Sequence, residues 1–251
     1  MSIWQQCQGE LQIKPIQGVL LRLVESQEQI ATLGYVDTLE EQAMLEVLLD
    51  NIKPNYPEHC QQLHYLLKTP FRYPPLKWGS RFGQVHEPGI FYGAATLEVT
   101  LAEAAYYRLI FWDSMTGNLP KAQIQTAHTL FSAPYQTELG IQLQHAPFTQ
   151  ATEIISHPSV YQPTQELGMA MRKSGVLAFE YPSARSPVAG ICIGLFSAKA
   201  LASTKPNDLS AWWCEVNAHG VSFKAANQNE LHHFARHLFT RENQLPMPAS
   251  P

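Results

Sequence analysis

Three residues whose side chains could do chemistry together follow one another at even spacing in the first half of the sequence. Arg81, Tyr92 and Glu103 are eleven residues apart. A guanidinium binds anionic oxygens in pairs, an aromatic ring offers a flat apolar wall, and a carboxylate stabilises positive charge that develops in a transition state. Glu103 lies between Ala102 and Ala104, so its carboxylate sits on a partly apolar surface and must be solvated or paired. Taken singly, the three residues are more typical of a surface ion pair, a core aromatic and an edge charge.

A second pattern surrounds Cys192, where Gly190-Ile-Cys192-Ile-Gly194 has the form of a nucleophile elbow with cysteine in the reactive position. Such an elbow requires a strand, a sharp turn and a helix, with a histidine later in the chain. The residues on both sides of Cys192 are apolar, which favours a buried cysteine in the middle of a strand. A hydrolase with Cys192 or Ser183 as its nucleophile is an alternative function.

Motifs for nucleotides and metals are missing from the sequence. It holds no G-x-x-x-x-G-K-[ST] phosphate loop, no G-x-G-x-x-G dinucleotide fingerprint and no H-E-x-x-H pair. His233 and His237 would share one face of a helix, but no carboxylate follows them closely enough to complete a metal site. The four cysteines, at positions 7, 60, 192 and 214, form no C-x-x-C pair. We therefore expect no metal and four reduced thiols.

The composition is typical of a globular protein. Of 251 residues, 45% are hydrophobic and 15% are charged, which excludes a disordered tail protein. The net charge of −4 provides no basic footprint for direct nucleic-acid binding. The first residues lack the pattern of a signal peptide, and no apolar run reaches ~18 residues. A cytoplasmic protein that does not bind a membrane is expected.

A strand and a helix must position the two central residues of the constellation. Residues 89–95 alternate as a strand does and carry Tyr92. Thr96 is a typical helix cap, and it predicts a helix from about 97 to 112 that carries Glu103.

The N-terminal part predicts one strand and one helix. Residues 15–25 indicate a strand, in which Val19, Leu21 and Leu23 would share one face. Thr38 and Glu41 form a capping-box pattern at the start of a helix over 38–53, and Pro54 ends it.

The second half of the sequence is rich in strands. Helices are expected over 163–173 and from about 229 to 240, and strands over 124–130, 140–143, 176–181, 190–196 and 212–223. This order predicts an α+β fold with a mixed, largely antiparallel sheet rather than an alternating βα array.

The order of four motifs resembles the RES domain, a family named for an arginine, a glutamate and a serine. The serine of this sequence would be Ser183. The motifs are Gly79-Ser-Arg-Phe-Gly83, Pro88-Gly-Ile-Phe-Tyr-Gly93, Leu101-Ala-Glu-Ala-Ala-Tyr-Tyr-Arg-Leu109 and Tyr181-Pro-Ser-Ala-Arg185. Each motif alone is weak, whereas their order is specific.

The resemblance implies a single RES-type domain over residues 1–240. Its core covers about residues 70–200. An N-terminal extension over 1–69 precedes the core and contains a helical insertion, the helix expected over 38–53. Residues 241–251 are expected to form a disordered tail.

The resemblance also implies a fold and an activity. Proteins of the RES family are similar in fold to ADP-ribosyltransferase toxins, and they consume NAD. The implied reaction breaks the nicotinamide–ribose bond by phosphorolysis, by hydrolysis or by transfer to a protein. NAD is then a substrate, inorganic phosphate is a candidate co-substrate, and no metal is needed.

The family further implies a biological setting. Its members are toxins of bacterial toxin–antitoxin pairs, so the expected partner is a cognate antitoxin that carries a DNA-binding domain. A homodimer is compatible with this setting. The alternative is a catalytically silent module that keeps the fold as a partner-binding surface.

Residue roles follow from the resemblance. Glu103 would stabilise positive charge on the ribose, and Ser183 would bind the ribose or orient Glu103. Arg81 would clamp the pyrophosphate, and Tyr92 would form the wall behind nicotinamide.

The family also places an arginine shortly before the motif arginine. Arg72 is the nearer candidate for this second basic contact, and Arg22 competes with it from the predicted strand over 15–25. Arg185, beside Ser183, is a further residue that could meet a phosphate.

Overall fold

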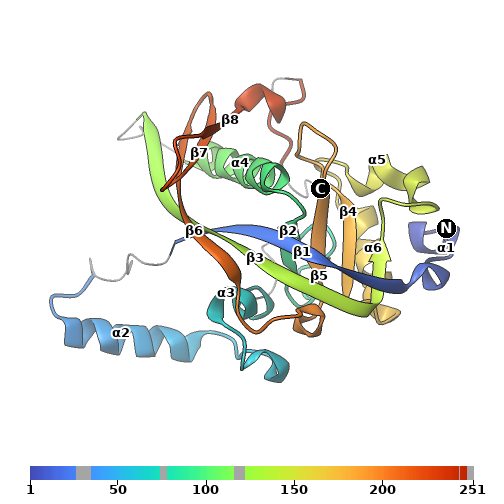
Figure 1. Ribbon diagram of the computed structural model, residues 1–251, viewed down its shortest axis with the longest axis horizontal. Coiled ribbons are helices and arrows are strands. Elements are labelled where there is room, and N and C mark those ends of the chain that lie inside the picture. The colour runs from blue at the N-terminus through green and yellow to red at the C-terminus, as the bar shows by residue number, and fades with distance from the viewer. Residues whose placement is uncertain (27–34, 74–77, 116–121, 243, 248–251) are drawn as a thin grey trace.

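One sheet dominates the computed structural model, which describes residues 1–26, 35–73, 78–115, 122–242 and 244–247 (Figure 1). Its strand order is β1-β2-β5-β4-β3-β6-β7-β8, and β1 also pairs with β3. Neighbouring strands are antiparallel except β3 and β4, which are parallel. The prediction of an α+β fold with a mixed, largely antiparallel sheet is confirmed. The strands are β1 Lys14–Glu25, β2 Phe91–Ala94, β3 Gln123–Gln142, β4 Ala178–Pro182, β5 Ile191–Leu195, β6 Asn207–Asn217, β7 Gly220–Ala225 and β8 Leu231–Ala235.

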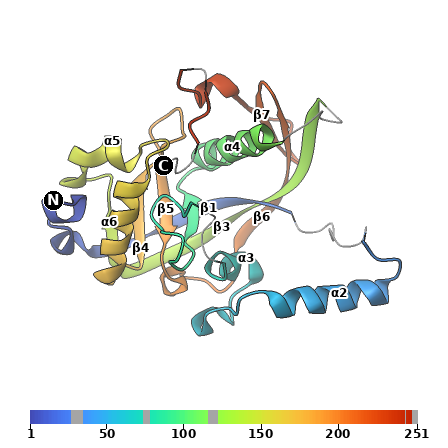
Figure 2. The same cartoon turned by 180° about the vertical axis from the view of Figure 1, so that it is seen from behind.

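The helices lie around this sheet. Figures 1 and 2 show α4 across the sheet beside β6 and β7, α5 and α6 near β4, and α2 standing away from the sheet. None of the helices in the described ranges is both long and apolar enough to cross a membrane. The α-helices are α1 Ile3–Gln6, α2 Leu39–Ile52, α3 Tyr65–Lys68, α4 Leu97–Ser114, α5 Thr152–Ile155 and α6 Gln162–Lys173.

Helix α4 begins where the sequence predicts. The Oγ1 atom of Thr96 accepts a hydrogen bond from the N–H of Val99 at 3.4 Å, which satisfies one of the first free amides of the helix. One face of α4 buries Leu101, Ala105 and Leu109 against β6 and β7. The remaining faces are left for other contacts, and one of them carries Glu103.

Helix α2 also begins at its predicted cap. The N–H of Glu41 donates to Oγ1 of Thr38 at 3.1 Å, and the N–H of Thr38 donates to the Glu41 carboxylate at 3.2 Å. The apolar residues of the helix do not form a core-facing stripe, because Leu39, Met44 and Leu48 are exposed.

Two stretches of the second half differ from the expected strands. The strands expected over 124–130 and 140–143 are one strand, β3, because β1 pairs along it from Lys14 opposite Gly140 to Glu25 opposite His128. The strand expected over 212–223 is the hairpin of β6 and β7.

The prediction of a helix from about 229 to 240 is wrong. Its residues form β8 and a 3₁₀ turn over Arg236–Leu238. Leu231, Phe234 and Leu238 have helical spacing, but pairing with β7 buries only Phe234 and leaves the other two exposed. Tertiary pairing therefore outweighs the local pattern, and His233 and His237 share no helix face.

The segment expected to be a disordered tail is partly packed. Leu245 is buried in the same cluster as α4, and the hydroxyl of Tyr106 donates to the carbonyl of Pro246. Positions 243 and 248–251 lie outside the described residues.

Candidate active site

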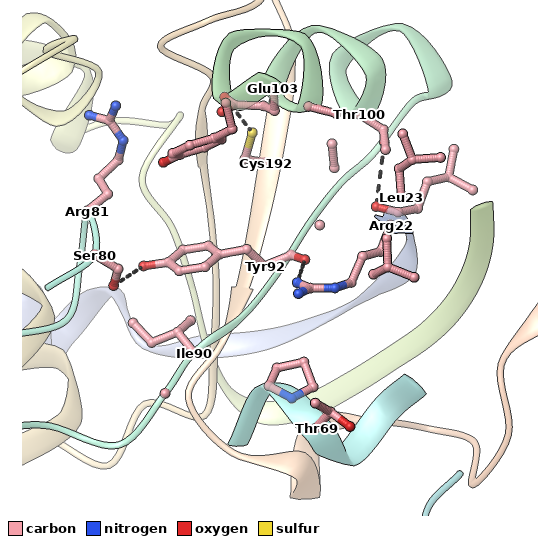
Figure 3. Close-up of a pocket in the computed structure, with 18 of the residues that line it drawn as sticks. Arg22, Leu23, Thr69, Ser80, Arg81, Ile90, Tyr92, Thr100, Glu103 and Cys192 are labelled. Carbon is pink, nitrogen blue, oxygen red and sulfur yellow. Dashed lines mark hydrogen bonds between the residues drawn. The ribbon is translucent and has the colours of Figure 1, made fainter. Parts of the chain in front are cut away.

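A pocket of about 670 Å³ lies between β1, β2 and α4 (Figure 3). Its volume is in the range of small-molecule and cofactor sites. Thr100, Glu103 and Tyr107 of α4 line it, at the spacing of one helix face. Arg22 and Tyr92 line it from β1 and β2. The pocket therefore gathers residues from three elements that are far apart in the sequence.

Glu103 has one carboxylate oxygen fixed by two neutral donors. Its Oε1 accepts a hydrogen bond from Oγ of Ser183 at 2.6 Å and another from Sγ of Cys192 at 3.4 Å. The residue is half-buried, and in the described part of the chain no lysine or arginine lies within ion-pair distance of it. Its negative charge is held in place and left uncompensated by a direct cation.

Ser183 reaches Glu103 from a tight loop behind the pocket wall. Its Oγ accepts hydrogen bonds from the N–H groups of Arg185 and Ser186 at 3.1 and 3.0 Å. Its own N–H donates to the carbonyl of Gly190 at 2.8 Å. With these acceptor interactions made, the hydroxyl proton is directed to Glu103. Ser183 contacts the carboxylate but is not among the residues that line the pocket.

Arg81 lies at the same end of the pocket as Glu103. Its Nη1 donates to the carbonyls of Ile155 and His157 at 3.2 and 2.7 Å, and its guanidinium lies 4.6 Å from the ring centre of Tyr161. Burial alone would lower the pKa of Arg81, but the nearby tyrosines and Glu103 raise it above its ordinary value. The side chain is therefore a permanent cation, and it also fixes the 155–157 segment.

Tyr92 joins the pocket wall to the loop that carries Arg81. Its hydroxyl lies 2.9 Å from Oγ of Ser80 and accepts the N–H of Phe82 at 3.2 Å. Burial raises the pKa of Tyr92 to about 12, so the phenol stays neutral. The ring forms part of the wall, while the hydroxyl braces the residues on both sides of Arg81.

Of the two candidates for the second basic contact, the structure brings Arg22 into the pocket. Figure 3 shows Arg22 and Arg81 on opposite sides of Tyr92. Arg22 donates to the carbonyl of Tyr92, its guanidinium lies 4.9 Å from the ring centre of Phe91, and burial lowers its pKa to about 10. Its Nε is buried without a hydrogen-bond partner among the described residues, and no carboxylate there pairs with it.

Arg72 lies elsewhere. Its Nη1 pairs with Asp50 of α2 at 3.1 Å, and its Nε donates to the carbonyl of Pro54. It is not among the pocket-lining residues. Arg72 therefore attaches α2 to the body of the protein.

Cys192 lies in the middle of a strand, as its apolar neighbours predict. It is opposite Ala94 of β2 and Tyr181 of β4. Burial and the charge of Glu103 raise the pKa of the Cys192 thiol well above its ordinary value. The thiol is a poor nucleophile in this setting, so the elbow interpretation fails on both backbone geometry and charge.

Three tyrosines complete the end of the pocket near Glu103. Tyr107 follows Glu103 by one helical turn, a spacing that the sequence shows. Tyr181 is the first residue of the serine motif, two positions before Ser183. Tyr161 also lines the pocket, and no sequence pattern points to it.

Arg185 does not line this pocket. Its guanidinium stacks on Tyr106 at 3.4 Å from the ring centre and donates to the carbonyl of Pro158 and the hydroxyl of Tyr161.

Within the described ranges no group of histidine, cysteine or carboxylate side chains is arranged to hold a metal ion.

Comparisons with known proteins identify a family and similar solved structures. The family model described as the RES domain matches residues 56–217. No curated protein matches the chain. A similar solved structure is the crystal structure of the MbcT–MbcA toxin–antitoxin complex of M. tuberculosis, with 9% sequence identity and a TM-score of 0.46. That similarity covers 86% of this chain and 91% of the other.

Proposed function

The chain belongs to the RES domain family, and from this premise we propose that it consumes NAD by cleaving the bond between nicotinamide and ribose. The proposal is supported by the family's activity and by the arrangement of Glu103, Arg22, Arg81 and Tyr92 around one pocket.

The observation that carries the proposal is that the Glu103 carboxylate is fixed by hydrogen bonds but paired with no cation among the described residues. Its carboxylate lines the pocket, is held through one oxygen by Ser183 and Cys192, and has no directly paired cation in the described part of the chain. When the bond to nicotinamide breaks, the bonding electron pair stays with the ring nitrogen, and positive charge develops on the ribose. A fixed, uncompensated carboxylate stabilises that charge without first having to reorganise.

The two arginines suit the pyrophosphate of a dinucleotide. Arg22 and Arg81 approach the pocket from opposite sides of Tyr92 (Figure 3). Arg22 has no carboxylate partner in the described ranges and retains a buried Nε without a partner. A buried cation in this condition gains most from an anionic ligand. We assign the pyrophosphate mainly to Arg22, with Arg81 supplying charge from the end near Glu103.

Tyr92 and its neighbours suit the nicotinamide ring. The Tyr92 and Tyr181 rings lie 6.4 Å apart between centres in an edge-on arrangement, and both line the pocket. Aromatic walls of this kind bind a flat heterocycle without requiring charge. The neutral nicotinamide that leaves is held less strongly than the cationic ring of NAD, which favours its release.

The acceptor of the ADP-ribosyl group is proposed to be inorganic phosphate. Glu103 is one of the groups that raise the pKa of Arg81, which places this cation close enough to interact with the reacting end. A fixed cation there offsets the repulsion between a phosphate dianion and the carboxylate. Attack by a phosphate oxygen forms the new bond to the ribose carbon as the nicotinamide leaves.

A toxin function with a cognate antitoxin is proposed from the family alone. Helix α2 is compatible with a partner, because it exposes Leu39, Met44, Val47, Leu48 and Ile52. Such an exposed apolar surface is typical of an interaction site.

The experiment that tests the function follows NAD loss with purified protein, with and without inorganic phosphate, and resolves the products by chromatography. Loss only with phosphate supports a phosphorylase. Loss in both conditions without a mass gain on the protein indicates a hydrolase, and a mass gain indicates transfer to the protein.

The matched variants are Glu103→Gln and Glu98→Gln, since Glu98 is an exposed carboxylate on the same helix. We expect only Glu103→Gln to abolish NAD loss. If the wild-type protein leaves NAD intact in every condition, the silent partner-binding module becomes the better assignment.

A further inference from the structure

We propose that Cys192 is a positioning residue, and that its thiol and the Ser183 hydroxyl together hold Oε1 of Glu103 so that Oε2 is the oxygen that faces the substrate. This inference rests on the proposed function. Of the two experiments that test it, the first measures NAD turnover and the second measures thiol reactivity in the protein without NAD.

The first step is the convergence of two donors on a single oxygen. Ser183 and Cys192 come from the loop after β4 and from β5, and both hydrogen bonds end on Oε1 of Glu103, at 2.6 and 3.4 Å. In the described part of the chain no hydrogen bond reaches Oε2. A carboxylate bound in this way has lost its freedom to rotate, and its two oxygens are no longer equivalent.

The second step is that the thiol must act as a donor. Cys192 is 2% exposed, and its pKa is raised well above the ordinary value by burial and by the charge of Glu103. It therefore keeps its proton at neutral pH, and the S–H points at the nearest anionic acceptor. A thiol is a weak donor, but a hydrogen bond to a charged acceptor is stronger than one to a neutral acceptor.

The third step is the rigidity of the strand that carries the thiol. Cys192 is paired on both sides, with Ala94 of β2 and with Tyr181 of β4. β2 carries Tyr92, and Tyr181 of β4 lies two positions before Ser183. The thiol thus ties the carboxylate to the same sheet segment that forms the aromatic wall of the pocket.

The kinetic test compares three variants in the NAD-loss assay. Cys192→Ala removes the donor, Cys192→Ser replaces it with a hydroxyl, and Cys60→Ala removes another fully buried thiol that is not among the pocket-lining residues. We expect Cys192→Ala to lower kcat about tenfold with little change in KM, because one hydrogen bond to a charged group is lost. Cys192→Ser should recover most of this loss, and Cys60→Ala should behave as the wild type.

Two kinetic results would overturn the proposal. One is an equal loss in Cys192→Ala and Cys192→Ser, which would indicate packing alone. The other is a rise in KM with kcat unchanged, which would place Cys192 in substrate binding.

A second measurement needs no NAD. The rate at which iodoacetamide alkylates Cys192 is followed by peptide mass spectrometry in the wild type and in Glu103→Gln, at mildly alkaline pH. Because the carboxylate raises the pKa of the thiol, its removal should increase the alkylation rate severalfold, with Cys60 unchanged. Equal rates at Cys192 would show that the contact does not form and would overturn the proposal. Faster alkylation in a protein that consumes no NAD would support the contact and overturn the proposed function instead.

Discussion

The hydroxyl of Ser183 lies 2.6 Å from Oε1 of Glu103, although eighty positions separate the two residues in the chain. The contact joins the loop after β4 to the middle of α4. It is the only described hydrogen bond of the Ser183 hydroxyl in which Oγ donates, since its other two bonds accept backbone N–H groups. The orientation of the candidate catalytic carboxylate therefore depends on a residue outside its own helix.

Replacing Ser183 with alanine should reduce the turnover of NAD. The variant leaves Glu103 with one weak donor, so we expect kcat to fall about ten- to a hundredfold while KM for NAD changes little. Ser186→Ala is the matched control, because the buried Ser186 hydroxyl in the same loop has no hydrogen-bond partner among the described residues. Steady-state NAD consumption would check this, and equal losses in both variants would contradict it.

Replacing Arg22 with glutamine should weaken NAD binding. Arg22 lines the pocket, has no carboxylate partner in the described ranges and keeps a buried Nε without a hydrogen-bond partner there, so we expect KM to rise at least about tenfold. Arg72→Gln should leave KM unchanged, because Arg72 pairs with Asp50 away from the pocket. Isothermal titration of both variants with NAD would compare them directly. A larger effect of Arg72→Gln would restore Arg72 as the second basic contact.

Replacing Tyr92 with phenylalanine should destabilise the protein although the ring is kept. The change removes the acceptor of the buried Phe82 N–H and the partner of the Ser80 hydroxyl. An unsatisfied buried donor costs about 1–3 kcal/mol, so the free energy of unfolding should fall by that amount. Tyr65→Phe is the control, since Tyr65 also lines the pocket but is 49% exposed. Denaturant unfolding of the two variants would test this. Equal free energies of unfolding would show that the hydrogen bonds of the Tyr92 hydroxyl do not stabilise the protein.

The buried imidazole of His128 should make the protein less stable in mild acid. Burial and, to a smaller extent, the charge of Arg108 lower the pKa of His128 to about 4, against about 6.5 in an unfolded chain. Between these two values the unfolded chain binds more protons than the folded one, so stability falls as pH decreases through this window, by up to about 3 kcal/mol.

The variant His128→Gln tests this by denaturant unfolding at a series of pH values. Its free energy of unfolding should depend less on pH between about 6.5 and 4 than that of the wild type. The exposed His59 provides the control His59→Gln, which should keep the wild-type slope. A wild-type slope in His128→Gln would assign the acid sensitivity to other groups.

Local chemistry predicts much of the scaffold around the site. The helix that carries Glu103 starts at Thr96, and the strand that carries Tyr92 precedes it, because a cap and a two-residue alternation are properties of neighbouring residues. The same is true of the capping box at Thr38. The order of the four motifs was sufficient to indicate the family, and the family model confirms it.

Other features are decided by contacts between distant segments. β8 has the periodicity of a helix and becomes a strand only because β7 offers it an edge. Arg22 enters the pocket because β1 is paired with both β2 and β3, whereas Arg72 is drawn to Asp50 although it is closer to Arg81 in the sequence. Cys192 and Ser183 meet on one oxygen of Glu103 because β4 and β5 pair in a register that aligns them beside α4. The sequence by itself determined which residues carry reactive groups and which short elements hold them. The tertiary structure alone decided which of those groups meet, because strand register and side-chain direction depend on packing over the whole sheet.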